Sequence, residues 1–170
     1  RNLPYWLVLL HTPGLSNSHI RNLLNNFTTP HEIHKASTKT LIKYGLKKAS
    51  IDFMKTPHRS EIQADLEWLK QGDNHLVTIN DPRYPERLKQ IYDPPIAVYV
   101  KGDPEILSSL QISVVGSRSP SPDGKRNARD FAYNLARLGI TITSGLASGL
   151  DSCAHRGALE GQGLTIAVLG

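Results

Sequence analysis

The chain has 170 residues, of which 39% are hydrophobic, and it carries a formal net charge of +5. This length allows one or two domains with a packed core, and no apolar run is long enough to span a bilayer. A single cysteine, Cys153, excludes an internal disulfide framework and is typical of the reducing cytoplasm.

The N-terminal residues and the charge distribution bear on the compartment and on the possible partners. The sequence lacks an initiator Met and a cleavable signal pattern, so we expect a fragment with no membrane association. Residues 1–75 hold 10 Lys/Arg and 6 Asp/Glu, whereas residues 76–170 hold 10 and 9. A modest basic excess suits a polyanionic partner, although many cytosolic proteins are this basic and bind no nucleic acid.

Residues 1–72 show the pattern of a small all-helical domain. Ser16 or Asn17 can cap a helix that runs through Phe27. Further helices are expected over residues 31–36, 37–44 and about 57–71, and Gly72 stands where a C-cap belongs. We therefore place a domain boundary between residues 72 and 73.

Residues 73–170 alternate between strand and helix patterns. Short strands are expected over 76–79 and 96–100, then a buried strand over 112–115 and further strands over 140–143 and 164–169. Asp123 can cap the first helix of this part, and residues 151–159 form the second. The expected apolar face of the first helix is Ala128, Phe131, Ala132, Leu135 and Leu138. This order predicts an α/β fold, a truncated Rossmann-like parallel sheet preceded by the helical domain.

Two glycine-bearing loops follow neighbouring strands of this predicted sheet. Ligands collect at the carboxyl ends of parallel strands, where both loops should lie. Gly116 turns the backbone, Ser117 offers a hydroxyl, and Arg118 offers a planar five-donor fork suited to phosphate. The second loop, residues 144–151, opens a helix whose amides favour an anion. The loops predict a phosphate-binding pocket, with glycines placed for packing alone as the alternative.

The candidate binding residues come from these loops and the helices after them. Asp151 either caps its helix or also orients Arg118 or a ribose, and His155 either faces the loop or lies satisfied in its helix. Lys125 stands at the start of a helix, where a positive charge is unfavourable because it opposes the helix dipole. Two explanations remain open for this placement: a polyanion bound nearby, or a face that is simply solvated. The predicted DNA- or phosphate-binding set is Gly116, Ser117, Arg118, Lys125, Ser144, Gly145, Ala147, Gly149, Asp151 and His155.

Motifs for catalysis, metals and cofactors are missing from the sequence. It contains no GxSxG, Walker A or HExxH motif, and its histidines lack metal-ligand spacing. Gly116 is followed by Ser-Arg-Ser-Pro-Ser instead of the GxGxxG pattern of dinucleotide-binding proteins. We therefore expect no catalytic residues, no metal and no cofactor, and a protein that is not an enzyme.

A series of short motifs runs in order over residues 80–170. They are YP (84–85), DPP through KGD (93–103), VVGSR (114–118), SGLASGLDSCAH (144–155), GAL (157–159) and TIAVLG (165–170). Together they resemble the DNA-processing protein A family, also called DprA or Smf, of bacterial natural transformation. The resemblance places the family's phosphate-contacting arginine on Arg118 and its second glycine loop on residues 144–151. Leu150 stands where isoleucine or valine is commoner in the family.

The resemblance also implies a function and partners. It implies a Rossmann-like domain that binds single-stranded DNA without sequence preference, protects incoming strands and helps to load the RecA recombinase. It further implies a homodimer formed through that domain. A family motif with arginines and an asparagine would lie beyond residue 170.

Residues 1–70 resemble the SAM-like or helix-hairpin-helix-like N-terminal domain of many family members, through LHTPGLSNSHIRNLLNNF (10–27). In such modules a glycine turn presents amides to phosphates, here the turn at residues 12–15. The added charge would come from Lys39, Lys43, Lys47 and Lys48. A plain packing or partner-docking module is the alternative.

Two other functions remain open. A nucleotide-processing enzyme resembling phosphoribohydrolases would use the same loops for one terminal phosphate, but its PGGxGTxxE stretch is absent from these 170 residues. A pure interaction module would dock a partner through residues 1–70 and keep the sheet as a structural element.

Overall fold

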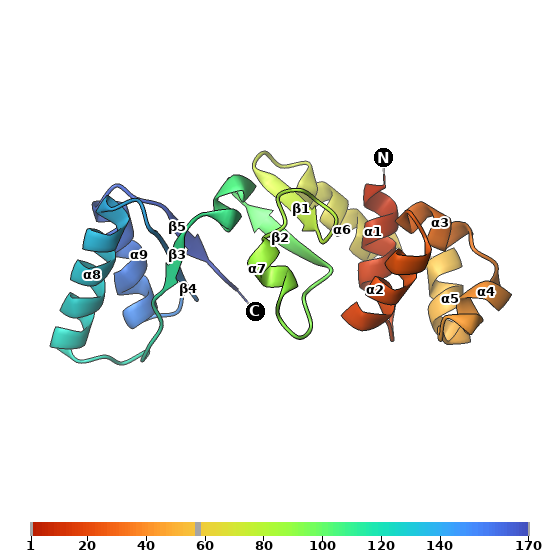
Figure 1. Ribbon diagram of the computed structural model, residues 1–170, viewed down its shortest axis with the longest axis horizontal. Helices are drawn as coiled ribbons and strands as arrows, with labels where there is room; N and C mark the ends of the chain where they lie inside the picture. The colour runs from red at the N-terminus through yellow and green to blue at the C-terminus, as the bar shows by residue number, and fades with distance from the viewer. Residues whose placement is uncertain (1, 57–58, 170) are drawn as a thin grey trace. The chain divides into compact units, whose positions relative to one another are not determined.

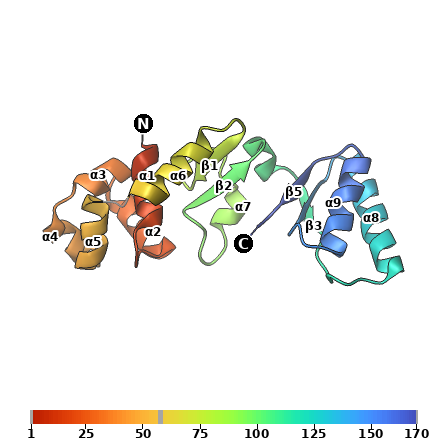
Figure 2. The same cartoon turned by 180° about the vertical axis from the view of Figure 1, so that it is seen from behind.

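The structure, a computed structural model, describes residues 2–56 and 59–169. These residues form two units, Arg1–Pro104 and Glu105–Gly170 (Figures 1 and 2). The boundary predicted between residues 72 and 73 falls inside the first unit. The reason is that Leu76, from the first strand after residue 73, and Ile96, just before the second, lie in the same buried apolar cluster as Leu7 and Leu23 of the helices.

Helices make up most of the first unit. They are α1 Leu3–His11, α2 Asn17–Asn26, α3 Pro30–Lys35, α4 Thr38–Lys43, α5 Lys48–Lys55 and α6 Arg59–Leu69. Ser16, Thr29 and Ser37 each accept a backbone N–H of the following helix, as short polar side chains do at N-caps. The helices predicted over 17–27, 31–36 and 37–44 are present. Helix α5 was not predicted, and the predicted helix start at residue 57 lies outside the described residues.

A hairpin with one short helix in its connection completes the first unit. Strand β1 (Asn74–Thr78) pairs antiparallel with β2 (Ala97–Lys101), and α7 (Glu86–Lys89) lies in the connection between them. The 3-10 helix η1 (Pro104–Ser108) follows β2 and leads into the second unit. Apolar side chains from the helices and the hairpin form one buried cluster. Burial of each large side chain in it contributes about 1.5–3 kcal/mol.

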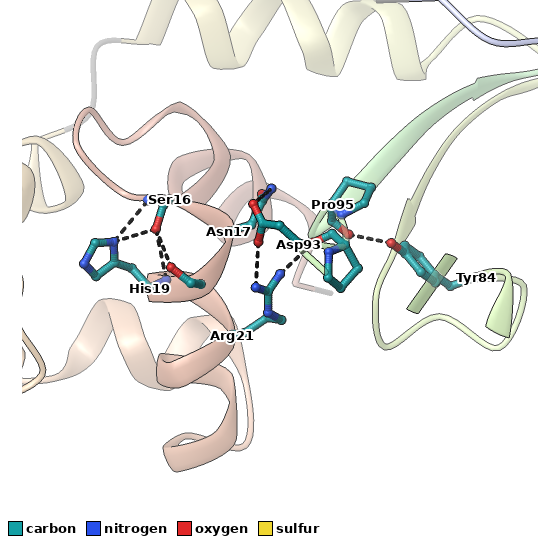
Figure 3. A network of polar contacts seen from close by, with 9 residues as sticks. Ser16, Asn17, His19, Arg21, Tyr84, Asp93 and Pro95 are labelled. Atoms are coloured by element: carbon teal, nitrogen blue, oxygen red, sulfur yellow. Dashed lines mark hydrogen bonds and ion pairs between the residues drawn. The ribbon is translucent and has the colours of Figure 1, made fainter. Parts of the chain in front are cut away.

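The YP and DPP motifs hold the hairpin connection against α2. The Arg21 guanidinium donates to the Asp93 carboxylate at 2.6 Å and to the Pro94 carbonyl at 2.7 Å (Figure 3). This contact with Arg21 lowers the pKa of Asp93 below its usual value. Tyr84 is only 1% exposed, and its hydroxyl donates to the Pro95 carbonyl at 2.6 Å. These motif residues therefore stabilise the first unit and lie outside the glycine loops.

Replacing Tyr84 with Phe should lower the free energy of unfolding by about 1–2 kcal/mol, because the part-buried Pro95 carbonyl loses its donor. Urea unfolding measures the change as a lower midpoint with an unaltered slope. The matched control is Tyr44→Phe, since the Tyr44 hydroxyl makes only an exposed 3.4 Å contact with Asn26. Equal losses in the two variants would contradict the role given to Tyr84.

The second unit is a parallel three-stranded sheet with two helices. In chain order its elements are β3 Gln111–Ser113, α8 Pro122–Arg137, β4 Thr141–Ser144, α9 Leu150–Glu160 and β5 Thr165–Ala167. The strand order is β3-β4-β5, and Ile112, Ile142 and Thr165 lie level across the sheet. The predicted α/β fold with a parallel sheet is confirmed. The first helix is capped by Ser121 and not by Asp123, because Pro122 already occupies the first helical turn.

Helices α8 and α9 lie side by side on one face of the sheet (Figures 1 and 2). Small residues set their close approach: a Cβ added to Gly157 on α9 would lie 2.1 Å from the Arg129 carbonyl oxygen on α8. Alanines therefore fill the buried side of α8, at Ala128, Ala132 and Ala136.

Two burial predictions for the second unit were wrong. Phe131 and Leu138, predicted to face the core, are 62% and 76% exposed. The tight helix pair leaves room only for alanine-sized side chains between α8 and α9. The strand over residues 112–115 was predicted to be buried, yet Ile112 and Val115 are exposed. Both described helices of this unit cover the same face of the sheet, so the opposite face has no helix from this part of the chain.

Candidate functional site

The loops after β3 and β4 lie against each other at the carboxyl edge of the sheet. The Leu150 N–H donates to the Ser117 carbonyl at 3.1 Å. A Cβ added to Gly149 would lie 2.3 Å from the Ser117 carbonyl oxygen, and one added to Gly116 would lie 2.1 Å from Cδ1 of Leu150. Gly149 also has φ +97°, a conformation that favours glycine. The two loops therefore form one continuous surface whose backbones touch.

This surface exposes a cation beside backbone amides. Arg118 is exposed and forms no ion pair with any residue in 2–56 or 59–169. The amides of Ser117, Arg118, Ala147 and Ser148 have no acceptor among those same residues. The Ser117 hydroxyl accepts the Ser119 N–H at 3.0 Å and keeps its own proton for a ligand. A guanidinium, a hydroxyl and free amides are the donors that bind phosphate oxygens.

Two leucines that were not predicted as site residues shape the second loop. Leu146 has φ +58° and is 55% exposed, a strained conformation for a branched side chain that often marks a functional loop. Leu150 packs under Gly116 and supplies the amide that joins the loops. The positive φ of Leu146 and the amide of Leu150 are backbone features, so the residue types gave no signal for them.

Ser144 and Asp151 belong to the predicted set but are buried and support the loops from below. The Ser144 hydroxyl donates to the Val114 carbonyl at 2.6 Å and ties β4 to the end of β3. The Asp151 carboxylate accepts the Gly145 N–H at 3.2 Å. Gly149, which has no side chain, occupies the N-cap of α9, and Asp151 forms no ion pair with Arg118. Asp151 therefore acts by fixing the Gly145 turn and neither caps the helix nor orients Arg118.

His155 faces the sheet and not the loops. It is only 7% exposed, and its Nδ1 lies 2.6 Å from Oγ1 of Thr165. The Thr165 hydroxyl donates its hydrogen to the Ile142 carbonyl. It therefore accepts a hydrogen bond from the N–H at Nδ1 of His155. The other ring nitrogen, Nε2, is buried without a hydrogen-bond partner among the described residues, so the predicted satisfied histidine is only half right: the ring is packed against the sheet with one of its two nitrogens bonded.

The cations at the start of α8 divide into paired and unpaired groups. Arg126 bonds Asp123 at 2.7 Å and Arg129 bonds Glu160 at 2.5 Å. Lys125 is exposed, forms no ion pair within the described residues and hydrogen-bonds to neither loop. It adds charge to this unit, and the contacts do not bring it into the loop surface.

The burial of His155 predicts a pH dependence of stability. Burial lowers the pKa of His155 below its ordinary value of 6.5, and nearby Asp151 offsets only part of this. Below about pH 6.5 the unfolded chain therefore binds more protons at this residue, and the free energy of unfolding falls as the pH drops towards 5. Urea unfolding across this range should show a shallower fall for His155→Gln.

A matched control separates His155 from the other histidines. His34, in the first unit, also has a pKa lowered by burial and by Lys55, so some pH dependence remains in the His155 variant. His34→Gln should remove this remaining part and keep the part that comes from His155. A His155 variant with the parent's profile would contradict the buried, neutral state of this side chain.

Comparisons with known proteins give the family. The family profile described as DNA recombination-mediator protein A matches residues 75–170. Protein Smf of Escherichia coli K12 is 45% identical over 118 residues, covering 69% of this chain and 31% of that protein. DNA processing protein DprA of Bacillus subtilis is 40% identical over 101 residues, covering 59% of this chain and 34% of that protein. The chain thus spans about a third of the length of these curated relatives.

A solved structure agrees with the sequence comparisons. The X-ray structure of DNA processing protein A from Streptococcus pneumoniae has a TM-score of 0.76 and 26% sequence identity to this chain. The alignment covers 98% of this chain and 57% of that one, and so includes both units. From its matched profile and its relatives, the chain belongs to the DNA recombination-mediator protein A family, the DprA or Smf proteins.

Proposed function

We propose that the joined loop surface binds the sugar-phosphate backbone of single-stranded DNA. The observation that carries this proposal is the contact of Gly149 and Leu150 with Ser117, which brings the exposed Arg118 guanidinium and the loop amides together on one surface. These donors recognise phosphates and carry no base information, so binding is independent of sequence. Exposure of Gly116, Ser117, Arg118 and Ser148 also suits a continuous strand better than a small enclosed ligand.

Family membership supports a role for this binding in recombination. The family profile is described as a recombination mediator, and two relatives are named for DNA processing. The protein would protect incoming single strands during natural transformation and help to load the RecA recombinase onto them. It would act in the cytoplasm as a homodimer, without enzymatic activity. No helix in the described part of the chain is long and apolar enough to cross a membrane.

A titration of labelled oligo-dT, followed by fluorescence anisotropy, tests the proposal. The chain should bind oligo-dT and a mixed-sequence strand of equal length with similar affinity. The logarithm of the affinity should fall linearly with the logarithm of the salt concentration, with a slope of about 0.7 for each phosphate contacted. Failure to bind either strand at low salt would refute the proposal. Release of free adenine from AMP, followed by chromatography, would instead support the phosphoribohydrolase alternative.

A further inference from the structure

The excess positive charge of the chain is concentrated in one part of the first unit. Residues 28–56 carry six lysines against two carboxylates. By contrast, residues 57–104 carry six basic and eight acidic side chains, and residues 105–170 carry six and five. The glycine loops therefore lie in a nearly neutral unit, whereas the net charge that attracts a polyanion lies elsewhere.

Four of these lysines are exposed on α4 and at the start of α5, and we call them the lysine surface: Lys39, Lys43, Lys47 and Lys48. None of them forms an ion pair with a residue in the described ranges. Lys39 and Lys43 are one helical turn apart, about 6 Å along the axis, and so share a side of α4. Helices α4 and α5 pack against each other (Figure 1), which brings the two pairs of lysines into one region.

Internal stabilisation does not account for the two lysines at the start of α5. Lys47 occupies the N-cap without a side-chain cap bond, and the first turn holds no acidic residue. Cations at a helix N-terminus oppose the helix dipole and are slightly destabilising. These charges therefore cost stability in the isolated chain, and a bound polyanion would reverse that cost.

The glycine turn between α1 and α2 packs against the same end of α5. The Ser50 hydroxyl donates to the Pro13 carbonyl at 2.7 Å, and a Cβ added to Gly14 would lie 3.4 Å from that hydroxyl. Ser50 lies in the first turn of α5, two residues after Lys48. The turn is therefore fixed in place beside the lysine surface.

We propose that the lysine surface is a second nucleic-acid contact, separate from the glycine loops, which binds phosphates of single strands and duplexes alike. The choice of nucleic acid as the polyanion rests on the proposed function. Lysine ammonium groups act as point charges and need no fixed phosphate geometry. The aromatic side chains next to them, Tyr44 and Phe53, are partly buried, so base stacking does not add a preference for single strands.

The test replaces three lysines in the full chain and compares them with three distant cations. The variant is Lys39→Gln, Lys43→Gln and Lys47→Gln, and Lys48 is kept because Asp52 lies one turn away and partly offsets its charge. The control is Lys70→Gln, Arg87→Gln and Lys101→Gln, all exposed in the same unit. Both variants lose the same formal charge, so any difference between them reports position.

The variant should reduce the salt slope by up to about 2 for oligo-dT and by roughly 2–3 for a duplex of equal length. The control should keep both parental slopes to within about 0.5. Each single substitution should lower the slope for oligo-dT by about 0.7, which keeps the test decisive if the circular dichroism of the triple variant shows altered folding. Slopes equal to those of the control would overturn the proposal. So would unchanged oligonucleotide binding together with abolished binding to poly-glutamate, because the surface would then serve an acidic protein.

The same measurements in an Arg118→Ala background separate this proposal from the function of the loops. DNA binding that survives this substitution and disappears with the three lysines supports the lysine surface, even if the loops bind nothing. Residual binding that is indifferent to the three lysines contradicts the proposal and leaves the loop site intact.

Discussion

Replacing Arg118 with Ala should weaken oligo-dT binding several-fold or more and flatten its salt dependence by about 0.7 for each phosphate that the guanidinium neutralises. Arg118 is the exposed guanidinium on the joined loop surface and has no ion-pair partner in the described residues. Its removal therefore leaves the fold unchanged and takes away only an interaction with the ligand. Anisotropy titrations at several salt concentrations measure both effects.

A conservative variant of Arg118 and a control at Arg126 show which property of Arg118 matters. Arg118→Lys keeps the charge but loses the planar fork, so it should retain the salt slope while losing part of the affinity. Arg126→Ala is the matched control, because Arg126 already bonds Asp123 at 2.7 Å and should change the affinity little. An Arg118→Ala chain with the parental affinity and slope would refute the assignment of this residue.

Replacing Gly149 with Ala should damage both stability and binding. The backbone of Gly149, with φ +97° and ψ −127°, lies in a region that side-chain-bearing residues rarely occupy, which alone costs an alanine about 1–3 kcal/mol. The added Cβ would also lie 2.3 Å from the Ser117 carbonyl oxygen and 2.8 Å from the Arg118 backbone, so the two loops must separate. We expect the loss of DNA affinity to be at least as large as that of Arg118→Ala, since the amides and the guanidinium move apart together.

Gly139 provides the control for this substitution. It has φ +80°, and no heavy atom lies within 4 Å of its added Cβ. Gly139→Ala therefore carries only the conformational cost and should bind oligo-dT normally. Urea unfolding and DNA titration of both variants separate strain from loop contact. If Gly149→Ala proved no more harmful than Gly139→Ala, the close contact between the loops would not matter for function.

Local patterns predicted the elements of the second unit and the place of its two glycine loops. Alternating apolar runs and amphipathic segments gave the parallel sheet, because strand and helix periods are encoded within a few residues. Gly116, Ser117 and Arg118 stay a prediction as phosphate ligands, which arose because an arginine directly after a glycine turn is hard to explain by packing alone. The pairing of this loop with Gly149 followed from the common edge of parallel strands.

Contacts between distant segments were not predictable in the same way. Asp151 and His155 share one side of α9, but only the folded chain shows that the partner of His155 is Thr165 and that of Asp151 is the Gly145 amide. Phe131 was expected in the core because it is large and apolar. Because α8 lies so close to Gly157, the side of α8 that faces α9 carries alanines instead, and Phe131 points away. The size allowed on α8 therefore depends on a residue of α9.

The most direct test of the central claim is an amide chemical-shift titration of the labelled chain with a short oligo-dT. The amides of residues 116–119 and 145–150 should then change most within the second unit, because they line the surface that the Leu150–Ser117 hydrogen bond holds together. Saturable binding in which these amides stay unchanged, with the shifts of this unit confined to the opposite ends of α8 and α9, would contradict the account.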